Sequence, residues 1–510
     1  MTDNTKVLST LFESNSPARA AIAAPGRAAM SYQGLARQSA RLGGELNAIG
    51  IGADDCVAIV APNGAAMAGA FLAVASASAA APLNPAYKQT EFEFYLSDLQ
   101  ASALVVHSGF DTPAREVASA LKIPVIELEE SEGGTAGTID FVLAGAHAKG
   151  RPPGPEDTAL VLHTSGTTSR PKIVPLSHAN LLASAAHIAK TLALSADDQC
   201  MNVMPLFHIH GLVAGVLSSL AGGGSVACTP AFEATRFFSW LEELTPTWYS
   251  AVPTMHQLVL ARAARNQAIV ERQKLRFIRS SSASLPAPVM HELEDTFGCP
   301  VIESYGMTEA AHQMTSNPLP PAPHKAGSVG IPAGPEVALM TPAGAMVAAG
   351  EEGEIVIYGP NVTAGYANNP TANQDAFQQG QDGKRWFRTG DLGVFDEDGY
   401  LRISGRIKEI INRGGEKIAP REVDDVLMEH PDVSQAVAFA VRHEKLGEDV
   451  AAVVVLHADA RVEERDLREF ASARLAGFKV PRQIIFAESI PKGPTGKLQR
   501  IGLAARLGLE

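Results

Sequence analysis

The stretch Thr164-Ser165-Gly166-Thr167-Thr168-Ser169-Arg170-Pro171-Lys172 is the sharpest local signal in the chain. It sets hydroxyl side chains and glycine between two strand-like apolar runs, Thr158–His163 and Lys172–Pro175. Backbone N–H groups and hydroxyls can surround phosphate oxygens, and a lysine adds positive charge. The Walker A pattern GxxxxGK[ST] is absent, which excludes a P-loop. Such a cluster alone is usually a surface turn, but its flanking strands and its terminal Pro-Lys favour a phosphate-binding loop.

Apolar runs like these two alternate with amphipathic stretches up to about Tyr400. Alternating strands and helices predict a layered α/β architecture. The run Ala65–Pro82 is too weakly hydrophobic for a membrane span and predicts a buried helix followed by a strand. Two Pro/Gly-rich segments, Asn317–Gly334 and Asn368–Lys384, are expected to be loops. Further strands are expected at Cys56–Ala61, Ser102–His107, Ser225–Thr229 and Thr247–Ala251, and helices at Ser177–Leu192 and Pro286–Phe297.

The composition changes after Tyr400, where Gly405-Arg406-Ile407-Lys408 opens a segment richer in charge. From Val423 the pattern predicts helix, strand, helix and strand, ending in the Pro/Gly-rich loop Pro491–Gly496. This segment is long enough for a small α+β domain joined by a short hinge. We therefore expect an N-terminal domain over residues 1–404 and a C-terminal domain over residues 405–510.

The charge and cysteine content narrow the class of protein. With 42 Lys and Arg against 55 Asp and Glu, the formal net charge is −13, which argues against nucleic acid or an anionic membrane as the main partner. The four cysteines are widely spaced without a CxxC pair, so neither a disulfide framework nor a zinc site is indicated. The first residues are polar, and Gly508-Leu509-Glu510 is not an SKL-type address. A reduced, cytoplasmic setting is expected.

Five segments together resemble the AMP-forming acyl-CoA synthetase family, which includes luciferases and peptide-synthetase adenylation domains. The loop quoted above resembles its phosphate loop, and four more segments match the family in the same order: Ser304–Glu309, Arg388–Asp391, Gly405–Glu409 and Pro491–Lys497. The resemblance covers essentially the whole chain. It implies an acid–thiol ligase that uses ATP and Mg²⁺ to adenylate a carboxylic acid, releases pyrophosphate, and then passes the acyl group to coenzyme A with release of AMP.

The resemblance also implies the residues that hold the nucleotide. Thr308 is expected at the α-phosphate, and Glu309 is expected to ligate Mg²⁺, which prefers carboxylate oxygen. Tyr305 and Gly306 are expected at adenine, Asp391 at the ribose hydroxyls and Arg406 at the ribose or phosphates. The β- and γ-phosphates are assigned to Thr164, Ser165, Gly166, Thr167, Thr168 and Lys172.

Three further roles belong to the C-terminal part of the chain. Lys497 matches the lysine that enters the site during adenylation, and Lys408 matches the hinge about which the small domain turns between half-reactions. Gly414 and Gly415 are expected to let the backbone approach the pantetheine arm closely. Taken alone, a lysine in a Pro/Gly loop would be an ordinary surface side chain. One departure from the family is Ile173, where a glycine usually follows the loop lysine; it still suits a strand.

The acid pocket is expected to be polar. His208 occupies the family position beside the carboxylate, and His210 follows it two residues later. The family alignment adds Ser281, Ser282 and His312. An alkyl chain would leave such buried polar groups unpaired, whereas a short acid with a second carboxylate could bind them. The alternatives are that the histidines are ordinary core residues and that the serines bond the nearby backbone.

Several stretches narrow the resemblance to the oxalate–CoA ligases of plants and fungi: residues 163–172, 205–212, 279–285, 359–366 and 405–420. Oxalate is therefore the favoured acid, with malonate and other short acids left open. The alternatives are a fatty- or aromatic-acid ligase of the same family and a non-catalytic nucleotide-binding protein. A module that loads a carrier protein is less favoured, because no carrier-like serine segment follows Lys497.

Overall fold

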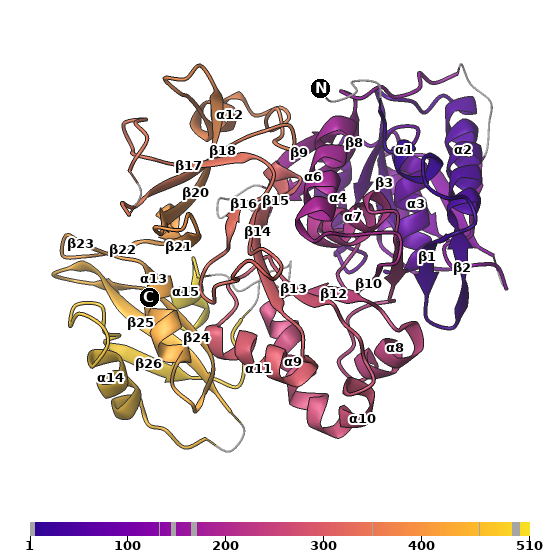
Figure 1. The fold of residues 1–510 in the computed structure, drawn as a ribbon. Coiled ribbons are helices and arrows are strands. Elements are labelled where there is room, and N and C mark those ends of the chain that lie inside the picture. The colour runs from indigo at the N-terminus through magenta and orange to yellow at the C-terminus, as the bar shows by residue number, and fades with distance from the viewer. Residues whose placement is uncertain are drawn as a thin grey trace. The chain divides into compact units, whose positions relative to one another are not determined.

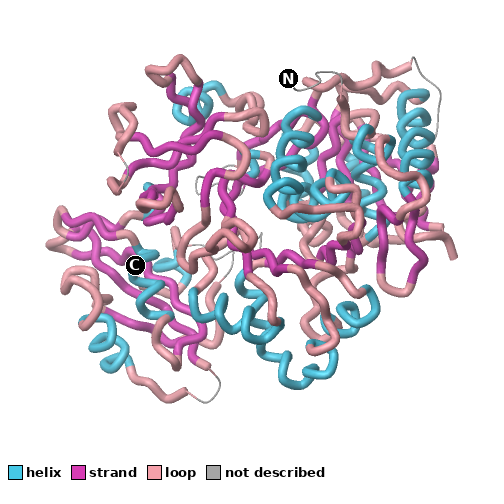
Figure 2. Tube along the Cα trace, viewed as in Figure 1, coloured by secondary structure: helices cyan, strands magenta, loops and turns pink. Residues whose placement is uncertain are grey.

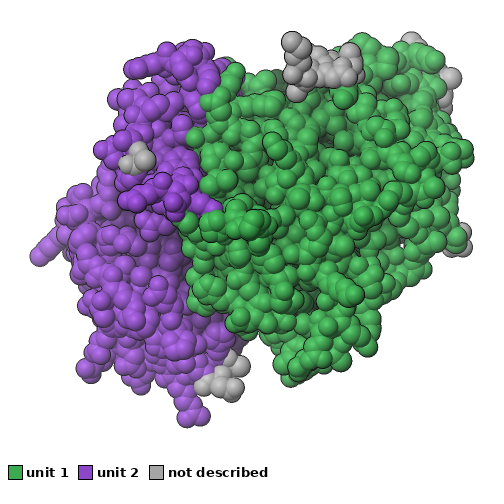
Figure 3. Space-filling view, viewed as in Figure 1, with its two compact units in different colours: residues 1–164, 171–337, 357–375 green, residues 165–170, 338–356, 376–510 purple. Residues whose placement is uncertain are grey.

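The computed structural model describes residues 6–131, 133–143, 149–164, 171–348, 350–457, 460–491 and 500–509 (Figure 1). Contacts group the chain into two compact units (Figure 3). The first comprises Met1–Thr164, Pro171–Val337 and Ile357–Asp375, and the second includes Ala338–Val356 and Ala376–Glu510. A boundary between residues 404 and 405 stays a prediction, since grouping by contacts does not test where a hinge turns.

The first unit is built on two mostly parallel sheets. One sheet runs in the order β16-β15-β14-β13-β12-β10-β11-β1-β2. Its strands are β1 (Ala20–Ala24), β2 (Arg27–Ser31), β10 (Gln199–Asn202), β11 (Ser225–Cys228), β12 (Trp248–Ala251), β13 (Phe277–Ser280), β14 (Val301–Met307), β15 (His312–Ser316) and β16 (Ile331–Pro332). The other runs in the order β7-β6-β5-β3-β4-β8-β9. Its strands are β3 (Cys56–Val60), β4 (Ala79–Pro82), β5 (Ala103–His107), β6 (Val125–Glu130), β7 (Ile139–Val142), β8 (Thr158–Thr164) and β9 (Lys172–Ser177).

Two helices lie between these sheets (Figure 2). Every residue of α3 (Ala65–Ala75) is buried, because the helix contacts β1 and β11 of one sheet and β3 and β7 of the other. Its alanine-rich composition suits this place, since small side chains allow close approach on all sides. Helix α6 (His178–Thr191) likewise contacts β15 of one sheet and β8 and β9 of the other, and its Ser177 N-cap accepts the N–H of Asn180.

Further helices cover the outer faces. Apolar residues of α8 (Phe237–Leu244), α9 (Pro253–Ala263) and α11 (Ala287–Phe297) share a core with β10, β12 and β13. Those of α4 (Gln89–Asp98) and α5 (Ala114–Ala120) share a core with β3, β5 and β8. The result is the layered α/β architecture that the sequence predicts. The remaining helices of this unit include α1 (Thr10–Glu13), α2 (Tyr32–Ala48), α7 (Ser218–Ala221) and α10 (Gln267–Val270).

The second unit holds two smaller sheets. One has the order β17-β18-β20-β19 with β21 beside β20, formed by β17 (Glu336–Met340), β18 (Gly353–Tyr358), β19 (Phe377–Gln379), β20 (Arg385–Phe395) and β21 (Leu401–Arg406). The other has the order β23-β22-β25-β24 with β26 beside β25, formed by β22 (Ile411–Arg413), β23 (Glu416–Ile418), β24 (Val433–His443), β25 (Gly447–Leu456) and β26 (Gln483–Phe486). Helices α13 (Pro420–Met428) and α14 (Glu464–Ser472) pack on one face of that sheet, and α15 (Leu503–Arg506) on the other.

The predicted strands and helices of the first unit are confirmed, with ends shifted by a few residues. Three expectations were wrong. The segment expected as a loop at Asn317–Gly334 contains the short strand β16. The segment expected as a loop at Asn368–Lys384 contains α12 (Pro370–Ala376) and β19. The C-terminal part has two antiparallel strands, β24 and β25, where one was expected. The charged residues between them, Glu444 and Lys445, form a short turn, and a turn this brief barely interrupts the sequence pattern.

Over the part of the chain that the structure describes, no helix combines the length and apolar character needed to cross a bilayer.

Candidate active site

The predicted phosphate loop is the connection of a β-hairpin. Strands β8 and β9 pair antiparallel, so that Thr164 lies opposite Lys172 and His163 opposite Ile173. Ser165, Gly166, Thr167 and Thr168 lie outside the described residues. Ile173 is buried in the core shared with α4, and its carbonyl accepts the N–H of Ala367. The departure from glycine at this position therefore serves the packing of β9.

Lys172 and Glu309 are joined through Tyr366. The Lys172 ammonium lies 4.3 Å from the centroid of the Tyr366 ring, a cation–π distance. The Tyr366 hydroxyl donates to Glu309 Oε1 at 2.8 Å. Burial and the Glu309 carboxylate raise the pKa of Tyr366, so the hydroxyl keeps its proton and remains a donor. Residues far apart in the sequence thus hold one carboxylate and one cation close together.

Glu309 sits on a turn that follows directly from β14. The turn η3 (Thr308–Ala310) is a 3₁₀ turn, and it leaves Thr308 half-buried and Glu309 only 6% exposed. The Glu309 carbonyl accepts the N–H of Thr363, which ties the turn to the segment that carries Tyr366. A buried carboxylate fixed in this way can give one oxygen to Mg²⁺, which usually takes its remaining ligands from phosphates and water. Among the described residues, no group of three or more His, Cys, Asp or Glu side chains could hold a metal by itself.

Close backbone contact between β14 and β15 explains why the residue at position 306 is glycine. A Cβ atom on Gly306 would lie 1.8 Å from the carbonyl oxygen of His312, so only glycine fits. Tyr305, half-buried on β14, pairs with Thr315 across the same two strands. The tight return from η3 places Ala311 at φ 46° and His312 at φ 97°, a region that residues other than glycine rarely adopt.

Three of the predicted acid-pocket residues come together. His210 is 2% exposed at the start of the π-helix η1 (His210–Leu217), an element that is frequently found at functional sites. Its Nδ1 is hydrogen-bonded to Ser282 Oγ at 3.0 Å and its Nε2 to Ser250 Oγ at 2.6 Å. Its ring centroid lies 5.0 Å from that of His312. Ser282 also has a positive φ of 72°.

The other two predicted pocket residues are placed differently. Ser281 is buried, and its hydroxyl donates to the carbonyl of Ser304 at 2.9 Å, which is the backbone-bonding alternative raised for these serines. His208 is half-buried just before η1, with its ring centroid 4.6 Å from that of Phe207. Its predicted place beside the carboxylate stays a prediction.

Asp391 and Arg406 lie in the second unit and bind each other. They are opposite residues on β20 and β21. Arg406 donates from Nε to Asp391 Oδ1 at 2.6 Å and from Nη2 to Oδ2 at 3.3 Å. Asp391 is 7% exposed, and its N–H donates to Thr389 Oγ1. The two residues predicted to contact ribose are therefore preassembled, with Asp391 fixed by a bidentate guanidinium.

The predicted hinge and glycine pair follow along the same chain. Lys408 is exposed on the 3₁₀ turn η4 (Ile407–Glu409), directly after β21. Gly414 at φ 61° and Gly415 at φ 98° form the two-residue turn between β22 and β23. Both positive angles match the hairpin turn that favours glycine at both central positions. The turn alone accounts for the pair, so contact with pantetheine stays a prediction.

The predicted catalytic lysine, Lys497, lies outside the described residues, but the chain returns to the structure at Arg500. Arg500 donates from Nε to Glu409 Oε2 at 3.0 Å and from Nη2 to Asp424 Oδ2 at 2.8 Å, and its Nη1 donates to the carbonyl of Ala438. The side chain of Arg500, three residues after Lys497, thus binds both η4 and α13.

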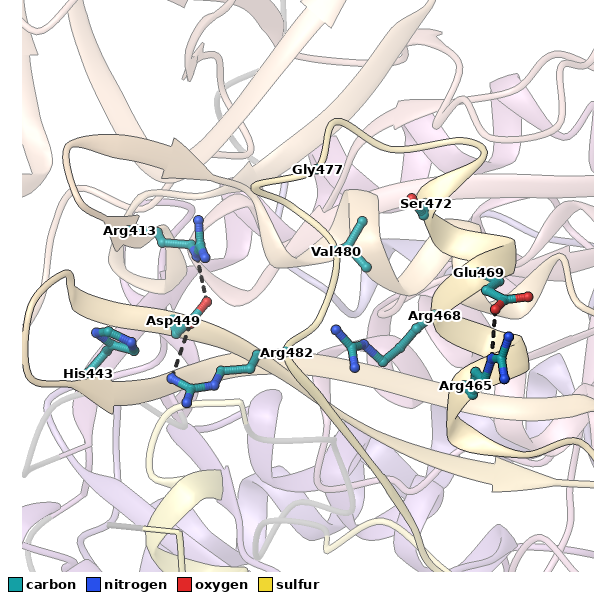
Figure 4. A pocket seen from close by; sticks show the side chains of 10 residues that line it. All are labelled: Arg413, His443, Asp449, Arg465, Arg468, Glu469, Ser472, Gly477, Val480 and Arg482. Carbon is teal, nitrogen blue, oxygen red and sulfur yellow. Dashed lines mark hydrogen bonds and ion pairs between the residues drawn. The ribbon is translucent and has the colours of Figure 1, made fainter.

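A separate cavity of about 740 Å³ lies in the second unit, lined by residues of α14, of strands β22, β24 and β25, and of the segment that precedes β26 (Figure 4). Asp449 pairs there with Arg413 at 2.6 Å and with Arg482 at 3.9 Å, and Arg465 pairs with Glu469. The cavity lining includes none of the predicted site residues, although Arg413 directly precedes Gly414. Arg413, Arg465 and Arg482 are thus paired with carboxylates, and Arg468 donates to the carbonyl of Pro481, so we assign the cavity no part in the reaction.

Sequence reasoning missed three contributors: Tyr366, Ser250 and Arg500. Tyr366 stands in the stretch 359–366, which carried part of the family resemblance but no assigned role. Ser250 stands on a strand that was recognised only as apolar. No local signal marks Ser250, because its role depends on a histidine from another segment.

Comparison with known proteins agrees with this arrangement. The family model "AMP-binding enzyme" matches residues 12–367, and "AMP-binding enzyme C-terminal domain" matches residues 422–497. A protein of Arabidopsis thaliana named oxalate–CoA ligase is 48% identical, with 88% of each chain covered. A protein of the same name from Saccharomyces cerevisiae is 40% identical, with 88% of this chain and 86% of that protein covered.

Solved structures give the same answer for the fold. The crystal structure of ATP-bound MatB from Rhodopseudomonas palustris superposes with a TM-score of 0.86 at 27% identity, covering 98% of this chain and 99% of that one. The two family models together span both units, and the relatives align over most of their own length. The chain belongs to the family of AMP-binding enzymes, which form acyl-adenylates.

Proposed function

We propose that the protein is an acid–CoA ligase that joins oxalate to coenzyme A in two half-reactions. The oxalate carboxylate first attacks the α-phosphate of ATP, forming oxalyl-adenylate and releasing pyrophosphate. The thiol of coenzyme A then attacks the acyl carbon, forming oxalyl-CoA and releasing AMP. The observation that carries the adenylation step is the Lys172–Tyr366–Glu309 arrangement, which holds a cation and a carboxylate together at the end of the predicted phosphate hairpin.

The protein's part in the first half-reaction is to position and to neutralise charge. Lys172 and the loop Thr164–Thr168 hold the β- and γ-phosphates, and Thr308 contacts the α-phosphate. Glu309 would hold Mg²⁺, which would supply positive charge to neutralise the phosphates. Asp391, already oriented by Arg406, accepts the hydrogen bonds of the ribose hydroxyls. Tyr305 and Gly306 lie at adenine, and Lys497 approaches the reacting carboxylate.

The second half-reaction uses the C-terminal domain, residues 405–510. Rotation about Lys408 withdraws Lys497 and brings the Gly414-Gly415 turn to the pantetheine arm. The turn is exposed and carries no side chains, which suits close backbone approach. The acyl acceptor is coenzyme A, supported by the names of both oxalate–CoA ligase relatives.

Oxalate is supported by the acid pocket as well as by these relatives. His210, Ser282 and His312 present hydroxyl and imidazole groups in a small cluster whose two histidines are buried. A fatty or aromatic acid would place an apolar chain against these polar groups, whereas a second carboxylate can accept hydrogen bonds from them. His208 is assigned to the reacting carboxylate and the cluster to the second one.

The four free cysteines support a reduced, cytoplasmic setting.

Acid-dependent exchange of labelled pyrophosphate into ATP tests the adenylation step. Purified protein with Mg²⁺ is expected to give the fastest exchange with oxalate, slower exchange with malonate, and little with octanoate or coumarate. The matched control is Lys172→Met, which keeps the length of the side chain and should lose exchange with every acid. Absence of acid-dependent exchange across the whole panel would reject the ligase, and fastest exchange with octanoate or coumarate would reject the short acid.

A further inference from the structure

Arg279 is a fully buried arginine in the middle of the larger sheet. It lies on β13, directly opposite Ser250 of β12 on one side and Ile302 of β14 on the other. Its exposed fraction is 0%. A guanidinium in this position is rare, because burying a charge is costly unless it is paired.

The guanidinium has few partners in the protein. Its Nη2 donates to Gln313 Oε1 at 3.3 Å. Among the described residues, its Nε and Nη1 atoms have no hydrogen-bond partner. Burial lowers the pKa of Arg279 to about 9, with a smaller opposing effect from the Cys200 thiol, so the group still carries its charge at pH 7. The charge is thus buried next to a neutral amide instead of a carboxylate.

Two connections place Arg279 directly behind the acid pocket. Gln313, its hydrogen-bond partner, is the residue that follows His312. Ser250, its neighbour in register, is hydrogen-bonded to His210 at 2.6 Å. The imidazoles and hydroxyls of the pocket can donate hydrogen bonds, but a neutral imidazole brings no charge. Arg279 is the cation closest in the sheet to this cluster.

We propose that Arg279 is a positioning residue that determines specificity for an acid with a second negative charge. This inference rests on the proposed function. The reacting carboxylate of a dianionic acid becomes part of the adenylate, while the other stays ionised in a buried pocket beside nucleotide phosphates. Arg279 compensates the negative charge of this second carboxylate, acting through Gln313 and across the low-dielectric interior. The bound acid in turn compensates the positive charge of the buried guanidinium. A monoanionic acid has no second charge for Arg279 to compensate, so Arg279 does not strengthen its binding.

The test compares oxalate with oxamate, in which an amide replaces one carboxylate at nearly the same size. Arg279→Met keeps the length but removes the charge, and Arg279→Lys keeps the charge. In the exchange assay we expect Arg279→Met to lower kcat/KM for oxalate about tenfold more than for oxamate, mainly through KM, since one lost charge interaction is worth about that factor. Arg279→Lys should recover most of the ratio. Equal losses with both acids would show a merely structural role and overturn the inference.

A second variant leaves the guanidinium in place. Gln313→Glu puts a carboxylate where Arg279 already donates, so the protein itself compensates the charge. The ratio of oxalate to oxamate should fall towards that of Arg279→Met, even if the methionine variant fails to fold. An unchanged ratio in folded Gln313→Glu would contradict the proposal. Wild-type protein that activates no acid would instead reject the proposed function, so the two failures are distinguishable.

Discussion

His312 and Ser282 combine a strained backbone with side chains that face His210. Their φ angles are 97° and 72°, and each such conformation costs about 1–3 kcal/mol. The surrounding hydrogen bonds and the close contact between Gly306 and His312 hold this geometry. Strain of this kind persists where the rest of the fold over-determines it, and it commonly marks sites of binding or catalysis.

His312→Ala tests the pocket at this scale. Loss of the imidazole should raise KM for oxalate about tenfold, the effect expected when one hydrogen bond to a charged group is lost, with KM for ATP changed less than about twofold. The measurement is steady-state pyrophosphate release with each substrate varied in turn. His291→Ala is the matched control, since His291 is exposed on α11. An unchanged KM for oxalate would remove His312 from the pocket.

The residues that hold the site were only partly predictable from the sequence. Lys172, Glu309 and Asp391 were found because each stands in a short motif whose order is specific to the family. Tyr366 was not, because it connects two of those motifs only in the folded chain. Arg279 opens the stretch 279–285, which carried part of the resemblance, and no sequence pattern shows that two of its nitrogens lack partners among the described residues.

At the scale of elements, Arg500 joins the chain three residues after Lys497 to two elements of the second unit. It binds Glu409 of η4 and Asp424 of α13, and burial raises the pKa of Asp424 to about 6, still below neutral pH. The turn η4, helix α13 and Arg500 therefore share one ion-pair cluster, in which Asp424 is buried. Prediction of elements was successful where apolar runs were separated by clear loops, as with α3 and β4. It failed at β24 and β25, whose turn is too short to divide the pattern.

Arg500→Ala should destabilise the second unit by about 3–5 kcal/mol, because it leaves the buried Asp424 carboxylate without its cation. Exchange activity should fall as well, since the chain close to Lys497 loses the contacts of Arg500 with Glu409 and Asp424. Thermal unfolding and the exchange assay measure the two effects. Arg465→Ala is the matched control: its partner Glu469 is one helical turn away, its side chain is 83% exposed, and neither quantity should change. Equal effects from both variants would contradict the anchoring role.

At the scale of the whole molecule, buried histidines link stability to pH. His178 begins α6 and its Nδ1 accepts the N–H of Leu8, which ties the start of the described chain to the sandwiched helix. Burial lowers the pKa of His178 to about 4 and that of His256 to about 3. Below pH 6.5 the unfolded chain binds protons at these positions and the folded chain does not, so stability is lost as the pH falls.

This linkage predicts that each of these histidines lowers the free energy of unfolding by about 2 kcal/mol between pH 7 and pH 5. His178→Asn keeps an acceptor near Nδ1 but does not titrate. Urea unfolding followed by tryptophan fluorescence at both pH values should show a smaller pH dependence for this variant than for the wild type. The same pH dependence in both proteins would show that His178 is not the titrating group.

The central claim is that the two half-reactions end in a thioester of a short dicarboxylate. The most direct measurement incubates purified protein with ATP, Mg²⁺, coenzyme A and one acid at a time, and identifies the CoA product by mass spectrometry. Oxalate is expected to give the highest yield, as oxalyl-CoA, with one AMP formed per thioester. A higher yield from octanoate or coumarate, or AMP formation without any thioester, would contradict the account.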